Sequence, residues 1–302
     1  MTRAVFTCVS IVALVLSPSS ARAQMFELVG IRAQGMGGAF VAVADDATAT
    51  WWNPAGLATG AYFNALAEYD RPRTPSDVDT RAAAIGLPSL GLSYYRLPVS
   101  QMRAAPPAET VQIDRLDQGY LTLFGVTVGQ SVGDHLVLSS TLNVERAVDD
   151  TRGDLDIGAM ARMGRIRLGV VMRNLTEPTF GEGAGALTLK RQARVGGAFL
   201  SGAHGTVAEA VIAVDGDLTS VTTVAGEEQH VAAGAELWLW QRTLGVRGGL
   251  SVDTKSDHGS ASGGVSLMLR SGKYLKTYVD GQLTGGTDEA RRGWSTGLRL
   301  TF

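Results

Sequence analysis

The sequence has little cysteine and little proline, with one cysteine and nine prolines among 302 residues. Cys8 lies near the amino terminus, in a stretch that we expect to be removed, so disulfides and thiolate chemistry are not expected in the mature chain. Beyond that stretch no run approaches 18 consecutive apolar residues, which excludes helical membrane spans. There is also no basic stripe, so we expect no nucleic-acid partner.

Residues 1–23 have the features of a cleaved secretory signal peptide. A short basic start is followed by an apolar run over residues 4–16, and Ala-Arg-Ala at residues 21–23 provides a small-x-small cleavage site before Gln24. The apolar run is shorter than the roughly 20 residues that a spanning helix needs. We therefore expect an exported mature chain that begins at Gln24.

From about residue 61 onward, apolar and polar residues alternate along short segments. In the last of them, Trp294 and Leu298 fall on one face, while Ser295 and Arg299 fall on the other. Such alternation marks strands with one apolar and one polar face. It predicts fourteen strands, at about residues 61–69, 81–87, 90–97, 118–128, 136–146, 155–163, 166–174, 192–200, 207–218, 230–240, 244–251, 262–269, 275–283 and 293–302. The second and third are short, so twelve strands remain an alternative.

The links between these strands alternate in length. Seven are long and more charged, at residues 70–80, 98–117, 147–154, 175–191, 219–229, 252–261 and 284–292. The six between them are short turns. Outer-membrane barrels have this asymmetry, with long extracellular loops and short periplasmic turns. The sequence therefore predicts an all-β fold, a transmembrane antiparallel β-barrel in outer-membrane lipid, with both ends on the periplasmic side.

A soluble β-sandwich or solenoid is the alternative fold, because it also uses alternating strands. Its inner faces would form a dry core, in which unpaired charges are costly. In this sequence, charged residues occur on the strand faces opposite the aliphatic ones: Glu145, Arg167, Arg173, Arg194, Glu209, Asp215, Glu236, Asp280 and Arg299. Their frequency suits a wet or salt-bridged lumen, so we expect these nine side chains to point into a barrel.

The carboxyl terminus carries a motif of its own. Gly297 is followed by alternating hydrophobic residues, of which Leu300 is the last, and by a terminal Phe302. This pattern resembles the signal by which the outer-membrane assembly machinery recognises its clients. Recognition needs an unpaired final strand with one apolar edge and a free aromatic end, and these three residues would provide both. We therefore expect the assembly machinery to be a partner of this chain.

Residues 30–58 form a glycine-rich segment ahead of the first strand. The spacing of Gly35 and Gly37 suggests a dinucleotide-binding loop, but that pattern needs a glycine where Phe40 stands, and no βαβ unit follows. Together with Gly38, these glycines instead allow close packing of the backbone.

Two polar elements follow in the same segment. Asp45 and Asp46 fit the start of a helical turn, and Asn53 with Pro54 is a turn or helix-start signal. A glycine-rich stretch, then alanine and aspartate, then an Asn-Pro-Ala element before the first strand resembles the amino-terminal region of a superfamily of outer-membrane barrels. That superfamily includes the FadL-type long-chain fatty-acid transporters and the PorV/PorQ-type proteins.

A second resemblance lies further along the chain, where residues 156–159, 168–175 and 191–196 are similar to the barrel of PorV-like members. The resemblance implies three parts, namely the signal peptide over 1–23, a plug or hatch over 24–60 and the barrel over 61–302. The expected hatch motif consists of Gly35, Gly37, Gly38, Asp45, Asp46, Asn53 and Pro54. A segment that only stabilises the barrel and a segment that gates it remain equal alternatives.

Catalysis finds no support in the sequence. The four histidines fall in predicted turns or at strand edges on both sides of the membrane, and no Ser/His/acid set or close metal cluster is present. We therefore expect a protein that is not an enzyme, with no catalytic residues, no bound metal and no cofactor.

Two functions follow from the resemblance. The first is a FadL-like channel or transporter for small hydrophobic or amphipathic molecules, gated by the hatch. The second is a PorV-like scaffold or shuttle for secreted or surface proteins, which would use long loops such as 98–117 and 175–191. A structural outer-membrane protein is a third alternative. The mixed signs of the nine lumen charges, four basic and five acidic, argue against a simple ion-selective pore.

Overall fold

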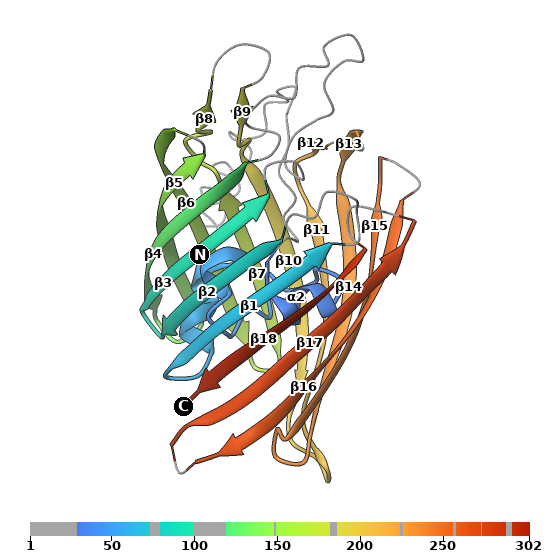
Figure 1. Cartoon of the computed structure of the whole chain (residues 1–302). Helices are drawn as coiled ribbons and strands as arrows, with labels where there is room; N and C mark the ends of the chain where they lie inside the picture. Colours follow the sequence, from blue (N-terminus) through green and yellow to red (C-terminus); the bar gives the residue numbers. More distant parts are fainter. Residues whose placement is uncertain are drawn as a thin grey trace, which may run out of the picture.

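The computed structural model describes residues 29–72, 79–98, 119–147, 149–181, 186–223, 226–255, 258–272, 274–287 and 292–302. In these residues, antiparallel strands form one closed barrel (Figure 1). Around the barrel, in chain order, they are β1 (Asn64–Pro72), β2 (Thr80–Leu87), β3 (Leu90–Pro98), β4 (Tyr120–Val132), β5 (Leu136–Ala147), β6 (Asp150–Met163), β7 (Ile166–Arg173), β10 (Gln192–Ser201), β11 (Val207–Asp217), β14 (His230–Leu239), β15 (Leu244–Asp253), β16 (Gly259–Ser271), β17 (Lys276–Gly286) and β18 (Gly293–Thr301).

The barrel closes where its last strand pairs with its first. β18 runs antiparallel to β1, from Thr301 opposite Asn64 to Gly293 opposite Pro72. Because hydrocarbon offers no partner to backbone N–H and C=O groups, a spanning sheet has to close on itself. The closed ring confirms the predicted β-barrel and its fourteen strands, and the alternative of twelve strands is wrong.

The strand ends agree with the predicted segments to within four residues, with one exception. β6 begins at Asp150, which lies opposite Ala147 of β5. The prediction of a long loop over residues 147–154 is therefore wrong, because most of that segment is strand. The two strands stay hydrogen-bonded beyond the segment in which apolar and polar residues alternate. Backbone pairing needs a neighbouring strand, but it does not need an apolar face.

The two ends of the barrel differ. The carboxyl terminus and the short turns lie at the lower end in Figure 1, which we call the short-turn end. The strand ends that the long links connect lie at the upper end, which we call the long-loop end. Two long links contain small hairpins, β8 (Thr179–Phe180) with β9 (Leu187–Thr188) and β12 (Val221–Thr223) with β13 (Gly226–Glu228). The predicted signal peptide lies outside the described residues, as does the predicted loop 98–117 apart from Pro98.

The barrel wall has apolar side chains outside and polar side chains inside. Leu142, Leu250 and Leu283 are 65%, 61% and 68% exposed, whereas Asn143 and Glu236 are buried. A mostly apolar outer surface is expected for a protein that is surrounded by lipid. The sandwich alternative is wrong, because the single sheet closes on itself and does not pack against a second sheet.

Residues 29–60 fold inside the barrel as a plug (Figure 1). Its elements are α2 (Ile31–Gly35), α3 (Ala49–Trp52) and the 3-10 helix η2 (Pro54–Thr59). Among the described residues, no helix has both the length and the apolar character needed to cross a membrane. A ring of about eight strands is already filled by its own side chains, so a ring of fourteen encloses space that water or further chain has to occupy. The plug occupies this space, and nearly all of its residues are buried.

Glycines in the wall make room for the plug. A Cβ atom on Gly158 would overlap with the side chain of Asn53, and one on Gly249 would overlap with the backbone of Met36 and Gly37. In both places the plug lies directly against the backbone of a strand. Part of the glycine content of this chain is therefore explained by close packing that any side chain would prevent.

We expect Gly249→Ala to loosen the plug. The added methyl group has no space beside the plug backbone, and such overpacking costs about 1–3 kcal/mol. The neighbouring Gly248 is the matched control, because the nearest atom to its added Cβ would be the Ser262 carbonyl oxygen at 3.8 Å. The heat-dependent change in gel mobility should occur at a lower temperature for Gly249→Ala and be unchanged for Gly248→Ala. Equal transition temperatures would contradict this account of the packing.

Candidate functional site

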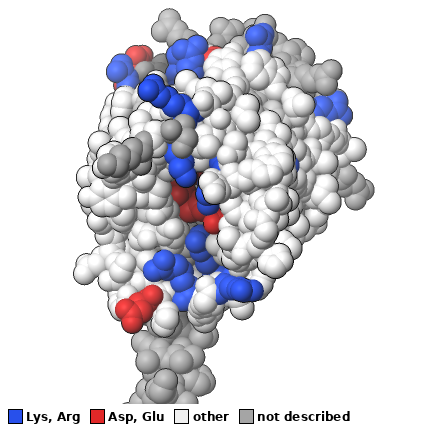
Figure 2. Space-filling model, turned by 90° about the horizontal axis from the view of Figure 1, so that it is seen from below, with Lys and Arg blue, Asp and Glu red and all other residues white. Residues whose placement is uncertain are grey.

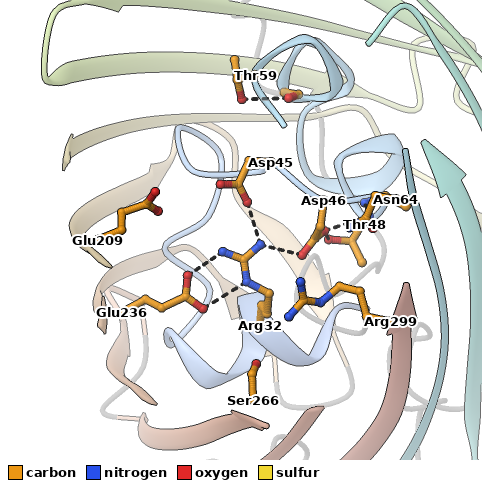
Figure 3. Close-up of polar contacts among 12 residues, drawn as sticks. Arg32, Asp45, Asp46, Thr48, Thr59, Asn64, Glu209, Glu236, Ser266 and Arg299 are labelled. Atoms are coloured by element: carbon orange, nitrogen blue, oxygen red, sulfur yellow. Dashed lines mark hydrogen bonds and ion pairs between the residues drawn. The ribbon is translucent and has the colours of Figure 1, made fainter. Parts of the chain in front are cut away.

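Arg32 of α2 is the centre of the contact between plug and wall (Figure 3). Its side chain is 3% exposed, and its Nη1 atom lies 2.6 Å from Asp45 Oδ1 and 2.9 Å from Asp46 Oδ2. The other edge of the guanidinium binds Glu236 of β14, through Nε at 3.0 Å and Nη2 at 2.5 Å. Two carboxylates of the plug and one of the wall therefore surround a single cation, and the contact with Glu236 is a two-point fork.

The ionisation of Asp45 follows from this arrangement. Burial alone would raise the pKa of its carboxyl, but the charge of Arg32, assisted by Arg167 and Arg242, holds that pKa below its usual value. The stability that this lowered pKa provides is present above the pKa of the unfolded chain. It is lost only as the pH falls through the lower pKa of the folded protein. The Arg32–Asp45 pair therefore persists at neutral and mildly acidic pH.

The charged network continues from Glu236 into the wall. Arg247 Nε of β15 lies 3.5 Å from Glu236 Oε1, and Arg247 Nη2 lies 3.6 Å from Asp280 Oδ1 of β17. Ser266 accepts a hydrogen bond from Arg247 and donates one to Asp280. Arg299 of β18 completes the network, with its Nε 2.9 Å from Asp280 Oδ2. Buried charges are costly unless they are paired, so the alternation of sign is what allows this network to lie in the interior.

Wall side chains also bind the backbone of the plug. Asp215 Oδ2 of β11 accepts hydrogen bonds from the amides of Phe40 and Val41, each at 2.7 Å. In the other direction, Asn53 Nδ2 donates to the carbonyl oxygen of Val41 at 3.0 Å and to that of Ala159 in β6 at 3.1 Å. Three further wall oxygens accept plug amides, those of Glu68 from Ile31, Asn64 from Ala47 and Ser262 from Gly37. The plug is thus held around its circumference by hydrogen bonds, and the chain itself joins it to the wall where η2 leads into β1.

The two tryptophans of α3 pack against arginines of the wall. The Arg173 guanidinium of β7 lies 3.4 Å from the ring centroid of Trp51, and that of Arg194 in β10 lies 5.7 Å from the ring of Trp52. Such contacts are attractive because the ring face carries negative charge density. Trp51 also meets Tyr95 of β3 edge to face, with 5.3 Å between ring centroids.

An apolar cluster covers the inner wall between α3 and the long-loop end. We define it as Tyr95 and Leu97 of β3, Leu121 and Leu123 of β4, and Phe180, Leu187 and Leu189 of the link between β7 and β10. Each of these side chains is at most 2% exposed, and all belong to one core with Trp51 of the plug. On the side of β3 and β4, the interior of the barrel is therefore apolar toward the long-loop end. Around Arg32, the interior is charged.

The structure places each residue of the expected hatch motif inside the barrel. Gly37 and Gly38 have φ angles of 69° and 88°, a region that favours glycine. Gly35 lies against the side chain of Arg247. The side chain of Asn53 accepts a hydrogen bond from the amide of Ala55, and Pro54 is the first residue of η2. Asp45 and Asp46 are the partners of Arg32.

The nine charged residues expected in the lumen lie on strand faces that turn inward, but they do not form one group. Glu236, Asp280 and Arg299 belong to the network around Arg32, whereas Arg173 and Arg194 pack on the tryptophans. Asp215 binds the plug backbone, and Glu145 lies apart on β5. Arg167 and Glu209, near the short-turn end, are partly exposed.

Sequence reasoning missed Arg32 and Arg247, two of the central cations. Arg247 falls on the same strand face as Gly245 and Gly249, so the alternation along β15 contained a signal for it. Arg32 gives no such signal, because it lies in a five-residue helix and its partner Glu236 is 204 residues away.

The expected assembly signal lies on β18 and just beyond it. Leu300 belongs to the outer face of β18, and Gly297 lies beside Ile31 of the plug. The ring of Phe302 is 50% exposed and meets Tyr62 and Tyr274 edge to face. Recognition of these residues by the assembly machinery stays a prediction.

Glu145 and Glu236 form a matched pair for testing the role of buried charge. Both are at most 1% exposed, but the carboxylate oxygens of Glu145 have no hydrogen-bond partner within the described residues. Glu236→Gln removes the negative charge that pairs with Arg32 and Arg247, and breaking a buried ion pair costs about 3–5 kcal/mol of stability. Glu145→Gln replaces a carboxyl group that lacks a partner by an amide of the same shape, so it should change the stability of the barrel little. The urea-unfolding midpoint should therefore fall for Glu236→Gln and stay near that of the wild type for Glu145→Gln, and an equal fall in both variants would contradict the account.

No protein-family model matches the sequence, and the comparison with curated proteins also finds no match. In structure, the chain is similar to the CymD monoaromatic hydrocarbon channel, with a TM-score of 0.56 and 12% identity over 91% of this chain and 97% of that chain. It is also similar to the toluene transporter TbuX of Ralstonia pickettii, with a TM-score of 0.57 and 12% identity over 91% and 97% of the two chains.

A third similar structure is a FadL homologue of Pseudomonas aeruginosa, with a TM-score of 0.54 and 11% identity over 94% of this chain and 99% of that chain. At sequence identities this low, the similarity shows a shared fold alone. A closer relation to PorV-like proteins stays a prediction. The predicted fold class is confirmed, and the chain has the fold of the FadL-type outer-membrane barrels.

Proposed function

We propose that this protein is an outer-membrane channel for small hydrophobic or amphipathic molecules, with the plug as its gate. The observation that carries the proposal is the division of the barrel interior. An apolar cluster covers one side of the wall toward the long-loop end, and below it lies a plug whose contacts with the wall are ion pairs, hydrogen bonds and packing. The names of the similar structures describe hydrocarbon and toluene transport, which supports a function in transport and not in catalysis.

The apolar cluster supplies the chemistry for taking up such molecules. A molecule that leaves water for contact with Leu97, Leu121 and Phe180 gains the free energy of burying its apolar surface, about 25 cal/mol for each Å². Trp51 belongs both to this core and to α3, so the binding region would be in direct contact with the gate. A ligand that separates these side chains would also disturb the packing of the plug.

The gate would move by exchanging one set of polar contacts for another. Displacing Arg32 from Glu236 exposes two charges in a poorly solvated interior, so the movement has to bring in water or new partners. Such a requirement favours two discrete positions of the plug over a gradual drift. We assign the gate to residues 24–60 and the wall to residues 61–302, after removal of the signal peptide over 1–23.

The scaffold function has less support. Its main candidate loop, residues 98–117, lies outside the described residues apart from Pro98. The other candidate, 175–191, contributes Phe180, Leu187 and Leu189 to the apolar cluster, so these side chains are buried against the wall and do not form a surface for a partner. Capture of secreted proteins by this chain stays a prediction.

Deleting the gene in the native host should reduce uptake of one or more hydrophobic compounds. The measurement is the accumulation of radiolabelled compounds from a panel of alkylbenzenes, alkanes and fatty acids in intact cells. Restoring the wild-type gene should restore uptake, and a water-soluble sugar serves as the control compound. Unchanged uptake across the whole panel would contradict the proposed function.

A reversible cross-link should show whether the plug is the gate. A Cβ atom on Gly86 of β2 would lie 3.6 Å from Cβ of Ala47 in the plug, within the range that a disulfide spans. The mature chain is expected to have no other cysteine, so Ala47→Cys with Gly86→Cys should form one defined bond.

In the deletion strain, the oxidised double variant should lose most of its uptake and regain it after reduction. The two single variants are matched controls, since they carry the same substitutions without the bond. If the oxidised double variant transports as fast as the reduced one, the plug is not the gate, although the barrel remains a channel.

A further inference from the structure

A charged cavity opens at the short-turn end, between the plug and the lower part of the wall. Its volume is about 340 Å³, and Figure 2 shows this end of the molecule, with basic side chains around a hollow that has acidic side chains at its centre. The basic residues that line the cavity are Arg32, Arg167, Arg242, Lys276 and Arg299. The acidic ones are Asp45, Asp46 and Glu209.

Three of these five cations have carboxylate partners. Arg32 binds three carboxylates, Arg299 binds Asp280, and Arg242 Nη1 lies 3.0 Å from Glu209 Oε2. Within the described residues, Arg167 and Lys276 form no ion pair, and Arg167 only donates a hydrogen bond to Thr59 Oγ1 at 3.5 Å. They belong to β7 and β17, which lie nearly opposite each other in the ring. Arg167 and Lys276 therefore face one cavity from opposite sides without a direct carboxylate contact, and the charge of Arg167 also acts on Asp45 across the cavity.

The turn that carries Arg242 is strained. Trp240, Gln241 and Arg242 have φ angles of 47°, 57° and 67°, which are unfavourable for residues that have a Cβ atom. Hairpin turns that need such angles usually contain asparagine and glycine. Backbone strain of this kind is concentrated at functional sites. In this turn, the Arg242 guanidinium lines the cavity and lies 4.6 Å from the ring centroid of Trp238.

We propose that this cavity binds a small oxyanion, a carboxylate or a phosphate, that enters from the short-turn end. Arg167, Arg242 and Lys276 would hold its oxygens, because guanidinium and ammonium groups bind oxyanions by charge-assisted hydrogen bonds. Tyr274 and Phe302 line the same cavity and provide apolar contact for the body of an organic acid. The site is separate from the apolar cluster and does not depend on which molecule the channel carries.

The test uses the full mature protein in detergent and isothermal titration calorimetry with benzoate, its neutral isostere benzamide, and inorganic phosphate as probes. Benzoate or phosphate should bind, and benzamide should bind at least about tenfold more weakly than benzoate, because losing one hydrogen bond to a charged group has about this effect. If benzoate binds, the ligand class of the cavity is an organic acid. If only phosphate binds, the ligand is the free phosphate ion.

The variant Arg167→Gln with Lys276→Gln should weaken binding of the anion by about tenfold or more. Arg270→Gln, at an exposed arginine that does not line the cavity, is the matched control and should leave binding unchanged. Arg242→Gln tests the site independently if the double variant does not fold, as judged by heat-dependent gel mobility. Binding of neither anion, equal binding of benzoate and benzamide, or full binding by both variants would overturn the proposal.

Discussion

Closure of the sheet between β1 and β18 is the constraint from which the rest of the structure follows. A strand edge inside a bilayer would leave backbone groups without partners, so fourteen spanning strands have to form a ring. A ring of that size encloses more space than its own side chains fill. The interior must therefore be occupied by water or by further chain, and in this protein residues 29–60 occupy it. Glycines of the inner wall make room for this segment, and charged side chains of the inner wall bind it.

The plug is held by contacts that are strong in a poorly solvated interior and that can still be exchanged. Arg32 binds three carboxylates, and one carboxylate oxygen of Asp215 accepts two plug amides. Separating either set without new partners would leave buried polar groups unpaired. If the plug moves as proposed, its movement is therefore coupled to the entry of water or of a ligand. A plug fixed only by apolar packing would lack this coupling.

The inner surface changes character along the barrel axis. Leu97, Leu121 and Phe180 are part of an apolar wall toward the long-loop end, whereas the cavity at the short-turn end has five cationic side chains. Trp51 links the apolar wall to the plug, and Arg32 links the plug to both the wall network and the cavity. The mixed signs at the charged end suit a site for a particular oxyanion better than a general filter for ions.

The sequence by itself determined the strand segments and the faces that turn inward, because the alternation of side chains along a strand is a local property of the backbone. It left the number of strands between twelve and fourteen, and the closed ring decided it. Sequence reasoning failed at residues 147–154, where pairing between β5 and β6 continues without an apolar face. The tertiary structure alone decided which charges meet. Arg32 and Glu236 are 204 residues apart, and Arg167 and Lys276 share a cavity only because the ring closes. Local pattern fixes the direction in which a side chain points, whereas its partner depends on which distant strand or plug residue occupies the space it points into.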